Sequence, residues 1–346
     1  MAKKNKIKAV LNYHIWSDDI HLKILDDIVT YAPKVINIFA AEEHEINNIW
    51  SSPNGFFPYK RAFIDNNIEV NFIFGAAHMD FYQDRYNFPE YNIRTILWPT
   101  YFLCFTLSSI RHSAYHLRHH DHTSKYTYPF ISMNNRPHRH RCMFLDQMAR
   151  ADLLDLGAVS WHNDNEIPYN WEWWDHPTRL TLTDQFETLG NSYALPAEWD
   201  VSFLNVVSEC SINRTYFSEK TWIPLLCLKP FLSQSNTGFY KTFTELGFVL
   251  YDEIFDYSFD EEADDAIRTE MIMNNVKKII GRDYQEMYNM LLPKLTHNFL
   301  KAIEIATSEN FIPDIVKNSE YAMLKYTALR DMKNISYKDM QNLEIR

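Results

Sequence analysis

Residues 201–222 read VSFLNVVSECSINRTYFSEKTW, and this stretch decides the fold. The apolar run 201–207 has the length and composition of a buried strand. Ser218 is a candidate N-cap for a following helix, and a second short apolar run occupies 230–233. A strand, a helix and another strand in this order are typical of a parallel α/β unit.

The start of this predicted helix is suited to hold a phosphate group. Free backbone N–H groups and the positive end of the helix dipole converge there. Lys220 adds a full positive charge, and Glu219 could accept hydrogen bonds from ribose hydroxyls. The spacing alone fits equally well with an ordinary capped amphipathic helix that carries a surface Glu and Lys.

The pattern Tyr-x-Ser-Glu-Lys-Thr-Trp at 216–222 resembles the donor-site motif of fucosyltransferase-type GT-B glycosyltransferases. It also resembles a motif in the glycosyltransferase-like proteins of tailed phages. The resemblance implies that Lys220 contacts the nucleotide diphosphate, Glu219 the ribose and Tyr216 the nucleotide region. It covers residues 130–270 and almost nothing before them.

Two further residues complete the donor side that the resemblance implies. Ser218 belongs to the motif itself and is the expected N-cap. Glu209 stands near the end of the preceding strand, where the family has a Glu-Asn pair. In this chain Glu209 is followed by Cys210, so the family pattern is only half matched there.

A second segment, FISMNNRPHRHR at 130–141, predicts a strand, a basic turn and the start of a helix that ends near Gly157. In the resembled proteins an Arg near this helix start contacts phosphate. Arg139 is the first choice for that role, with Arg136 and Arg141 as alternatives. A solvated basic loop is the other interpretation of the same residues.

The rest of the chain alternates apolar strand-like runs with helical segments. A helical pattern covers 18–31, and the chain is helical from Asp264 onward. Strands are expected at 7–13, 35–40, 70–75, 94–97, 158–161, 201–207, 230–233 and 248–251. Such alternation predicts an α/β protein with doubly wound parallel sheets.

Together with the resemblance, this alternation predicts the GT-B fold, in which two Rossmann-like domains face a cleft. The expected N-terminal, acceptor-side domain covers residues 1–130. The expected nucleotide-sugar-binding domain covers 131–310, and a C-terminal helical segment covers 311–346. A chain of 346 residues with 46% hydrophobic content is long enough for two such cores.

The composition disfavours several other classes of protein. The chain has only seven glycines and neither a Gly-x-Gly-x-x-Gly fingerprint nor a P-loop, which disfavours dehydrogenases and kinases. The four cysteines form no Cys-x-x-Cys pair, so buried reduced thiols are expected rather than a zinc ribbon or a disulfide framework. No signal-peptide core or membrane span is expected, and a cytoplasmic location fits best.

Positive charge gathers between Arg111 and Cys142 although the net charge of the chain is −11. Three basic residues of this stretch are candidates for contact with an acceptor or with DNA phosphates, namely Arg111, Arg118 and Lys125. Its histidines include a pair at helical i, i+4 spacing, which could hold a metal. Because no Cys or Glu partner stands at a recognised spacing, a polar surface is favoured and no metal is predicted.

Carboxylates and histidines near the ends of predicted strands are the candidates for catalysis. Asp18, Asp80 and His14 are expected as general bases, in that order, because a base should lie at the carboxyl end of an N-terminal strand. The acidic segment 252–265 contains Asp256 and Asp260, either of which could face the donor sugar. A solvated helix start enriched in acidic residues is the favoured explanation of that segment.

The sequence therefore leads to one main hypothesis, a glycosyltransferase that uses a nucleotide-diphosphate sugar as donor and requires no other cofactor. The acceptor suggested by the resemblance to phage proteins is a 5-hydroxymethylated pyrimidine in double-stranded DNA. A glycan or lipopolysaccharide acceptor is the alternative. A hypothesis of a different class is a non-catalytic protein that binds nucleotide or DNA on the same scaffold. The sugar, the base, the stereochemistry and the oligomeric state are left open.

Overall fold

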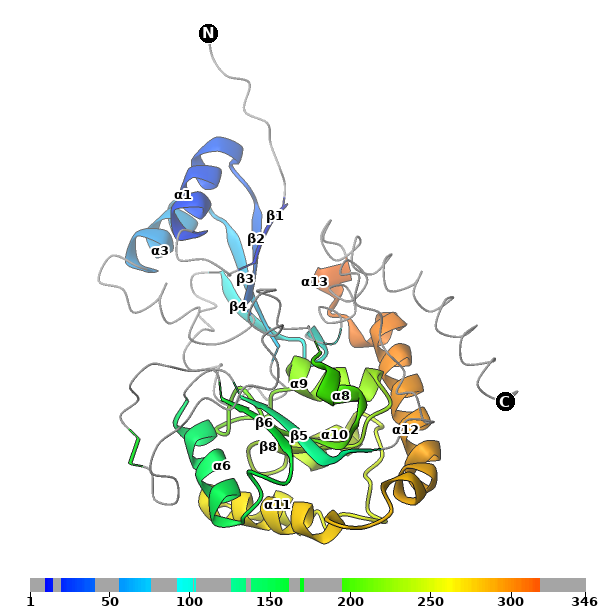
Figure 1. Cartoon of the computed structure of the whole chain (residues 1–346). Helices are drawn as coiled ribbons and strands as arrows, with labels where there is room; N and C mark the ends of the chain where they lie inside the picture. The colour runs from blue at the N-terminus through cyan, green and yellow to red at the C-terminus, as the bar shows by residue number, and fades with distance from the viewer. Residues whose placement is uncertain are drawn as a thin grey trace. The chain divides into compact units, whose positions relative to one another are not determined.

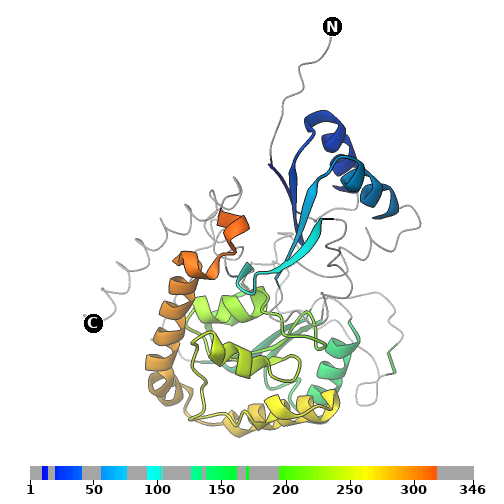
Figure 2. The same cartoon turned by 180° about the vertical axis from the view of Figure 1, so that it is seen from behind.

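The computed structural model describes residues 10–14, 20–40, 56–75, 92–101, 103, 126–134, 138–161, 169–170 and 195–317. The chain divides into two compact units, one made of residues 1–104 and 306–346 and the other of residues 105–305. Each unit contains a parallel four-stranded sheet with helices (Figures 1 and 2). The protein is thus an α/β protein with two Rossmann-like units, as the sequence predicts.

The N-terminal sheet has its strands in the order of the chain. They are β1 Val10–His14, β2 Val35–Ala40, β3 Glu69–Phe74 and β4 Ile93–Leu97. Its described helices are α1 Ile20–Tyr31 and α3 Phe56–Asp65, which contact each other. Right-handed crossovers that always advance in one direction place their helices on the same face, which explains this contact.

One face of the N-terminal sheet is held against α1, and the other carries a polar row. Tyr13 donates from its hydroxyl to Asp27 Oδ2 in α1 at 2.9 Å. On the opposite face Asn37 pairs with Asn71, and Asn71 pairs with Arg94 on β4. Asn71 Nδ2 donates to Asn37 Oδ1 at 3.1 Å in the buried interior. Because a slip of one residue would turn these amides to the other face, the row fixes the register.

The C-terminal sheet has a different strand order. Its strands are β5 Tyr128–Asn134, β6 Ala158–Trp161, β7 Ser202–Ser208 and β8 Phe231–Gln234, arranged as β6-β5-β7-β8. The chain leaves β5 toward β6 and then crosses back to build β7 and β8 on the other side of β5. The direction of winding therefore reverses between β5 and β7.

Helices cover both faces of the C-terminal sheet. They are α6 Arg139–Arg150, α8 Ala197–Asp200, α9 Glu219–Leu226, α10 Phe239–Glu245, α11 Asp265–Ile279 and α12 Tyr284–Thr307. Figure 1 shows α8 and α9 along one face and α6 and α11 along the other. The first face is closed by a core of Ile131, Ala158, Trp199, Ile223 and Cys227.

Three short elements complete the described fold. They are the 3₁₀ helices η2 Ser258–Glu261 and η3 Glu309–Phe311 and the helix α13 Asp314–Lys317. No helix in the described ranges has both the length and the apolar character needed to cross a membrane. Cys142 and Cys227 are buried free thiols as expected, but Cys210 is partly exposed.

Most predicted strands are present, but the strand predicted at 248–251 is not. There the backbone bonds to a side chain instead of a neighbouring strand. Val249 N donates to Asn298 Oδ1 at 2.8 Å, and Asn298 Nδ2 donates to Val249 O at 2.9 Å. The aromatic rings of Phe248 and Tyr251 are buried, so the apolar pattern that suggested a strand reflects core packing.

Candidate anion-binding site

The reversal in the C-terminal sheet places two helix starts side by side. The helix α6 follows the carboxyl end of β5, and α9 follows the carboxyl end of the adjacent strand β7. In open α/β sheets, ligands bind outside the carboxyl ends of the strands where the winding reverses. The topology thus points to the segments around residues 138–141 and 209–221 as a binding site.

A hydrogen bond joins the start of α6 to the end of β7. His140 Nε2 lies 2.8 Å from the carbonyl oxygen of Glu209, and the acceptor identifies this nitrogen as the protonated one. Burial lowers the pKa of His140 to about 4, with the charges of Arg141 and Lys220 acting in the same direction. The ring is therefore neutral at physiological pH and can donate this one bond without adding charge.

Ser218 is the N-cap of α9, as predicted. Its backbone is extended, and its Oγ accepts a hydrogen bond from Lys220 N at 3.2 Å. The same hydroxyl donates to Glu209 Oε2 at 2.5 Å. The cap is therefore itself held by a residue at the end of β7.

The carboxylate of Glu209 lies completely buried behind this cap. Its Oε1 also accepts from Thr221 Oγ1 at 2.5 Å, and its Oε2 accepts from Cys210 N at 3.1 Å. Burial raises the pKa of Glu209, whereas the charge of Lys220 and the two hydroxyl donors act to lower it.

Lys220 lies at the surface of the site, with 22% of its side chain exposed. Its Nζ is 2.5 Å from Glu219 Oε1 and donates to Cys210 Sγ at 3.3 Å. Burial acts to lower the pKa of Lys220, but Cys210 and Glu219 outweigh it, so the pKa lies above its ordinary value. The ammonium is thus a permanent cation held beside the start of α9.

The start of α6 provides a second cationic region. Its N-cap, His138, makes no side-chain capping bond, and the His138 and His140 rings stack with centroids 5.6 Å apart. Arg139 is exposed at the first helical position, while Arg141 is buried. The charge of Arg141 acts on the pKa of both His140 and Lys220, which places these groups near one another. An anion at this place would meet helix amides and several positive charges.

The start of α10 at the neighbouring strand β8 differs, because a carboxylate already occupies it. Asp260 accepts from Tyr240 N and from Lys241 N, both at 2.9 Å. Asp260, one of two acidic residues considered for a contact with the donor sugar, therefore serves as a cap for α10. Of the described helices that begin at this edge of the sheet, α10 is capped by Asp260 and α9 by the Ser218 hydroxyl, whereas the N-cap of α6 makes no side-chain capping bond.

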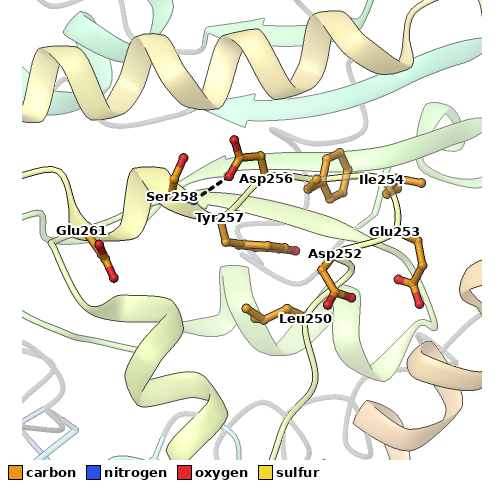
Figure 3. A pocket seen from close by; sticks show the side chains of 9 residues that line it. Leu250, Asp252, Glu253, Ile254, Asp256, Tyr257, Ser258 and Glu261 are labelled. Atoms are coloured by element: carbon orange, nitrogen blue, oxygen red, sulfur yellow. Dashed lines mark hydrogen bonds between the residues drawn. The ribbon is translucent and has the colours of Figure 1, made fainter.

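Beside η2 a separate hollow of about 690 Å³ opens in the C-terminal unit (Figure 3). It is lined by Leu250, Asp252, Glu253, Ile254, Phe255, Asp256, Tyr257, Ser258 and Glu261. Figure 3 shows the Asp256 carboxylate bonded to Ser258, whose backbone N–H donates to it at 2.9 Å. The hollow shares no residue with the site at α6 and α9.

The structure brings the predicted donor-side residues together only in part. Glu209, Ser218, Glu219 and Lys220 form one hydrogen-bonded group. Tyr216 stands just before the cap and is 4% exposed, so its side chain faces the interior.

Most of the other predicted residues lie outside the described ranges. His14 is the last residue of β1, at the carboxyl end of a strand of the N-terminal sheet. Six predicted residues lie outside the described ranges, namely Asp18, Asp80, Arg111, Arg118, Lys125 and Arg136.

Several residues of the site were not predicted from the sequence. Thr221 and His140 belong to the two motifs but carried no predicted role. Gln234, at the end of β8, accepts from Ser208 Oγ at 2.6 Å and donates to Thr269 Oγ1 at 2.8 Å. The available signal was position, because Gln234 ends β8 and His140 and Thr221 lie in the first turns of the helices that follow β5 and β7.

Within the described part of the chain, no group of three or more His, Cys, Asp or Glu side chains is placed to hold a metal ion. Comparison of the chain with protein-family models, with curated proteins and with solved structures gives no match.

Proposed function

We propose that this protein is a glycosyltransferase that moves a sugar from a nucleotide-diphosphate donor to a hydroxyl acceptor. The observation that carries the proposal is the pairing of the α6 and α9 starts at the reversal of the sheet. The bond from His140 to the Glu209 carbonyl joins them, and Lys220 and Arg139 lie beside them. Two helix starts flanked by cations suit the two phosphates of such a donor.

The chemistry of transfer uses this arrangement directly. As the glycosidic bond to the donor breaks, negative charge builds up on the departing diphosphate. Fixed positive groups and amides stabilise that charge without having to reorganise, which lowers the barrier. Lys220 and the amides of α6 would supply this stabilisation, and Glu219 would accept from the ribose hydroxyls once an anion has drawn Lys220 away from it.

The acceptor that we propose is a 5-hydroxymethylated pyrimidine in double-stranded DNA, which would place the reaction in the cytoplasm of a host cell. The basic stretch with Arg111, Arg118 and Lys125 would meet the DNA backbone, and the target base would have to leave the stack. A base is also needed to deprotonate the acceptor hydroxyl. His14, Asp18 and Asp80 remain the predicted candidates for that role.

Thermal-shift titration with UDP, GDP and their sugar conjugates tests the donor side. A ligand that binds only the folded state adds about 2.7 kcal/mol at 100 times its Kd. We expect stabilisation by one nucleotide family that is lost in Lys220→Ala. Stabilisation by none of them would contradict the proposal.

The nucleotide sugar found in this way is then incubated with hydroxymethylated DNA and, separately, with saccharide acceptors. Transfer to DNA is the expected result. Transfer to a saccharide alone would correct the acceptor, and nucleotide binding with no transfer to either would favour a non-catalytic binding protein.

A further inference from the structure

Both oxygens of the Glu209 carboxylate are occupied inside the protein. Glu209 is 0% exposed, so no ligand can reach its side chain. Each oxygen accepts from one hydroxyl and from one backbone N–H. Oε2 accepts from Ser218 Oγ and Cys210 N, and Oε1 accepts from Thr221 Oγ1 and, at 3.4 Å, from Ser218 N.

These four donors connect the end of β7 to the first turn of α9. Ser218 Oγ accepts from Lys220 N, so its single proton is the one donated to Glu209. Thr221, one residue after Lys220, is fully buried and held by the other oxygen. Lys220 is thus bracketed on both sides by residues that bond to the same carboxylate.

We infer that Glu209 is a positioning residue for the anion site. It fixes the first turn of α9 so that the ammonium of Lys220 faces the diphosphate, and it touches no ligand itself. This inference rests on the proposed function, and it differs from the donor contact that the sequence resemblance implied for Glu209.

A carboxylate is required at this position, and an amide of the same size cannot replace it. A glutamine has one acceptor oxygen and one NH₂ donor. Because Cys210 N points at one oxygen and Ser218 N at the other, either orientation of the amide would set its NH₂ against a backbone donor. Because a backbone N–H cannot act as an acceptor for this NH₂ group, Glu209→Gln must disturb the cap of α9.

Titration calorimetry with inorganic pyrophosphate tests the inference, because this ligand reports the anion site without a base or a sugar. The proteins to compare are the full-length chain and its Glu209→Gln, Lys220→Ala and double variants. We expect Glu209→Gln to weaken pyrophosphate binding roughly tenfold or more, since a charge-assisted bond is lost. In the Lys220→Ala background the same change should alter the affinity by less than about twofold, because coupled residues are not additive.

A milder variant covers the case in which Glu209→Gln does not fold. Thr221→Val keeps the shape of a buried side chain and removes one hydroxyl donor to Glu209. We expect it to weaken pyrophosphate binding about threefold to tenfold. Thr242→Val is the matched control, because Thr242 Oγ1 donates to Gly238 O at 3.0 Å near the start of α10. The control should leave the affinity unchanged.

The outcomes separate the inference from the function on which it rests. Unchanged affinity in both Glu209→Gln and Thr221→Val, or losses that simply add to that of Lys220→Ala, would overturn the positioning role alone. Absence of pyrophosphate binding by the unmodified chain would overturn the anion site and the positioning role together.

Discussion

The two sheets of this protein are both parallel and four-stranded, but they differ in how the chain winds through them. Among the described strands, the N-terminal sheet runs β1-β2-β3-β4 without a reversal, whereas the C-terminal sheet runs β6-β5-β7-β8. With right-handed crossovers, the first order keeps its helices on one face and the second distributes them over both. Only in the second order do the helices that follow two neighbouring strands, α6 after β5 and α9 after β7, lie on opposite faces of the sheet (Figure 1).

The buried polar residues follow the same difference. In the N-terminal sheet they form a row across the middle of the strands, where Asn71 bonds to Asn37. In the C-terminal sheet they occur within strands, as Ser132 and Asn205 do, and also at the carboxyl ends, where Glu209 and Gln234 lie. A polar row inside a sheet sets its register, while polar groups at the carboxyl edge shape a binding site.

Lys220 at the start of α9 and Lys229 beyond its end lie at opposite edges of the C-terminal sheet, and their surroundings differ. At the carboxyl edge Lys220 pairs with Glu219 and donates to Cys210 Sγ. At the amino edge Lys229 is 2% exposed, donates to the Ser202 carbonyl oxygen and lies 5.0 Å from the centre of the Trp199 ring. Burial lowers the pKa of Lys229 to about 7, whereas the pKa of Lys220 lies above its ordinary value. The carboxyl edge alone keeps its lysine as a fixed cation.

The largest effect is expected from Lys220→Ala. Removing one fixed positive group from the departing diphosphate should lower the rate of sugar transfer about 10²- to 10³-fold while the protein stays folded. Lys241→Ala is the matched control, because this exposed lysine occupies the first turn of α10, whose amides Asp260 already caps. Equal losses of transfer rate in Lys220→Ala and Lys241→Ala would show that the lysine at the start of α9 matters no more for transfer than the lysine at the start of α10.

The protonation of His140 should make stability depend on pH. The folded state keeps this ring neutral down to about pH 4, whereas the unfolded chain takes up the proton near pH 6.5. The unfolded state then binds more protons, so the free energy of unfolding should fall by up to about 3 kcal/mol as the pH drops through this window. When the free energy of unfolding is measured with urea at several pH values in this range, it should depend less steeply on pH in His140→Gln than in the unmodified chain. The same slope in both proteins would show that the His140 ring is not held neutral.

Gly157→Ala should destabilise the C-terminal sheet at its β6 edge. A Cβ at Gly157 would lie 2.3 Å from the Phe130 ring, so one of the two must move. We expect a loss of about 1–3 kcal/mol in the free energy of unfolding, measured with urea. The change should cost less in a Phe130→Leu background, because the ring that it strikes is gone. An equal cost in both backgrounds would rule out this contact as the cause.

Asp260→Ala tests the cap that closes α10. It removes the acceptor for the Tyr240 and Lys241 amides, which should cost about 1–2 kcal/mol of stability. The affinity for the nucleotide sugar, measured by calorimetry, should remain within about twofold of the unmodified chain. A selective loss of affinity for the nucleotide sugar but not for the free nucleotide would instead assign Asp260 to the donor sugar.

The smallest effect is expected in the polar row of the N-terminal sheet. Asn71→Val leaves Asn37 Oδ1 without the donor that Asn71 supplies and should cost about 1 kcal/mol. Replacing both residues by valine should cost less than the two single changes added together, because the bond between the two amides is then lost only once. Additive losses in urea unfolding would show that the pair contributes nothing beyond its separate residues.

The sequence predicts those features that are local in the chain. The apolar runs of β2 and β6 match the observed bounds, and Ser218 is the N-cap because its side chain and the amide it meets are two residues apart. The false strand at 248–251 and the cap from Asp260 to Lys241 depend on partners 49 and 19 residues away. The burial of Glu209 could not be predicted either, since its role is set by the path of the chain between β7 and α9.

The most direct test of the account is to map pyrophosphate onto the backbone amides of the labelled protein by NMR. We expect the amides at the starts of α6 and α9 to shift on titration, above all those of Arg139, His140 and Glu219. The amides of Tyr240 and Lys241, which Asp260 already caps, should stay in place, as should those of β1 to β4. Shifts centred on the start of α10 or on the N-terminal sheet would contradict the claim that the reversal between β5 and β7 builds the anion site.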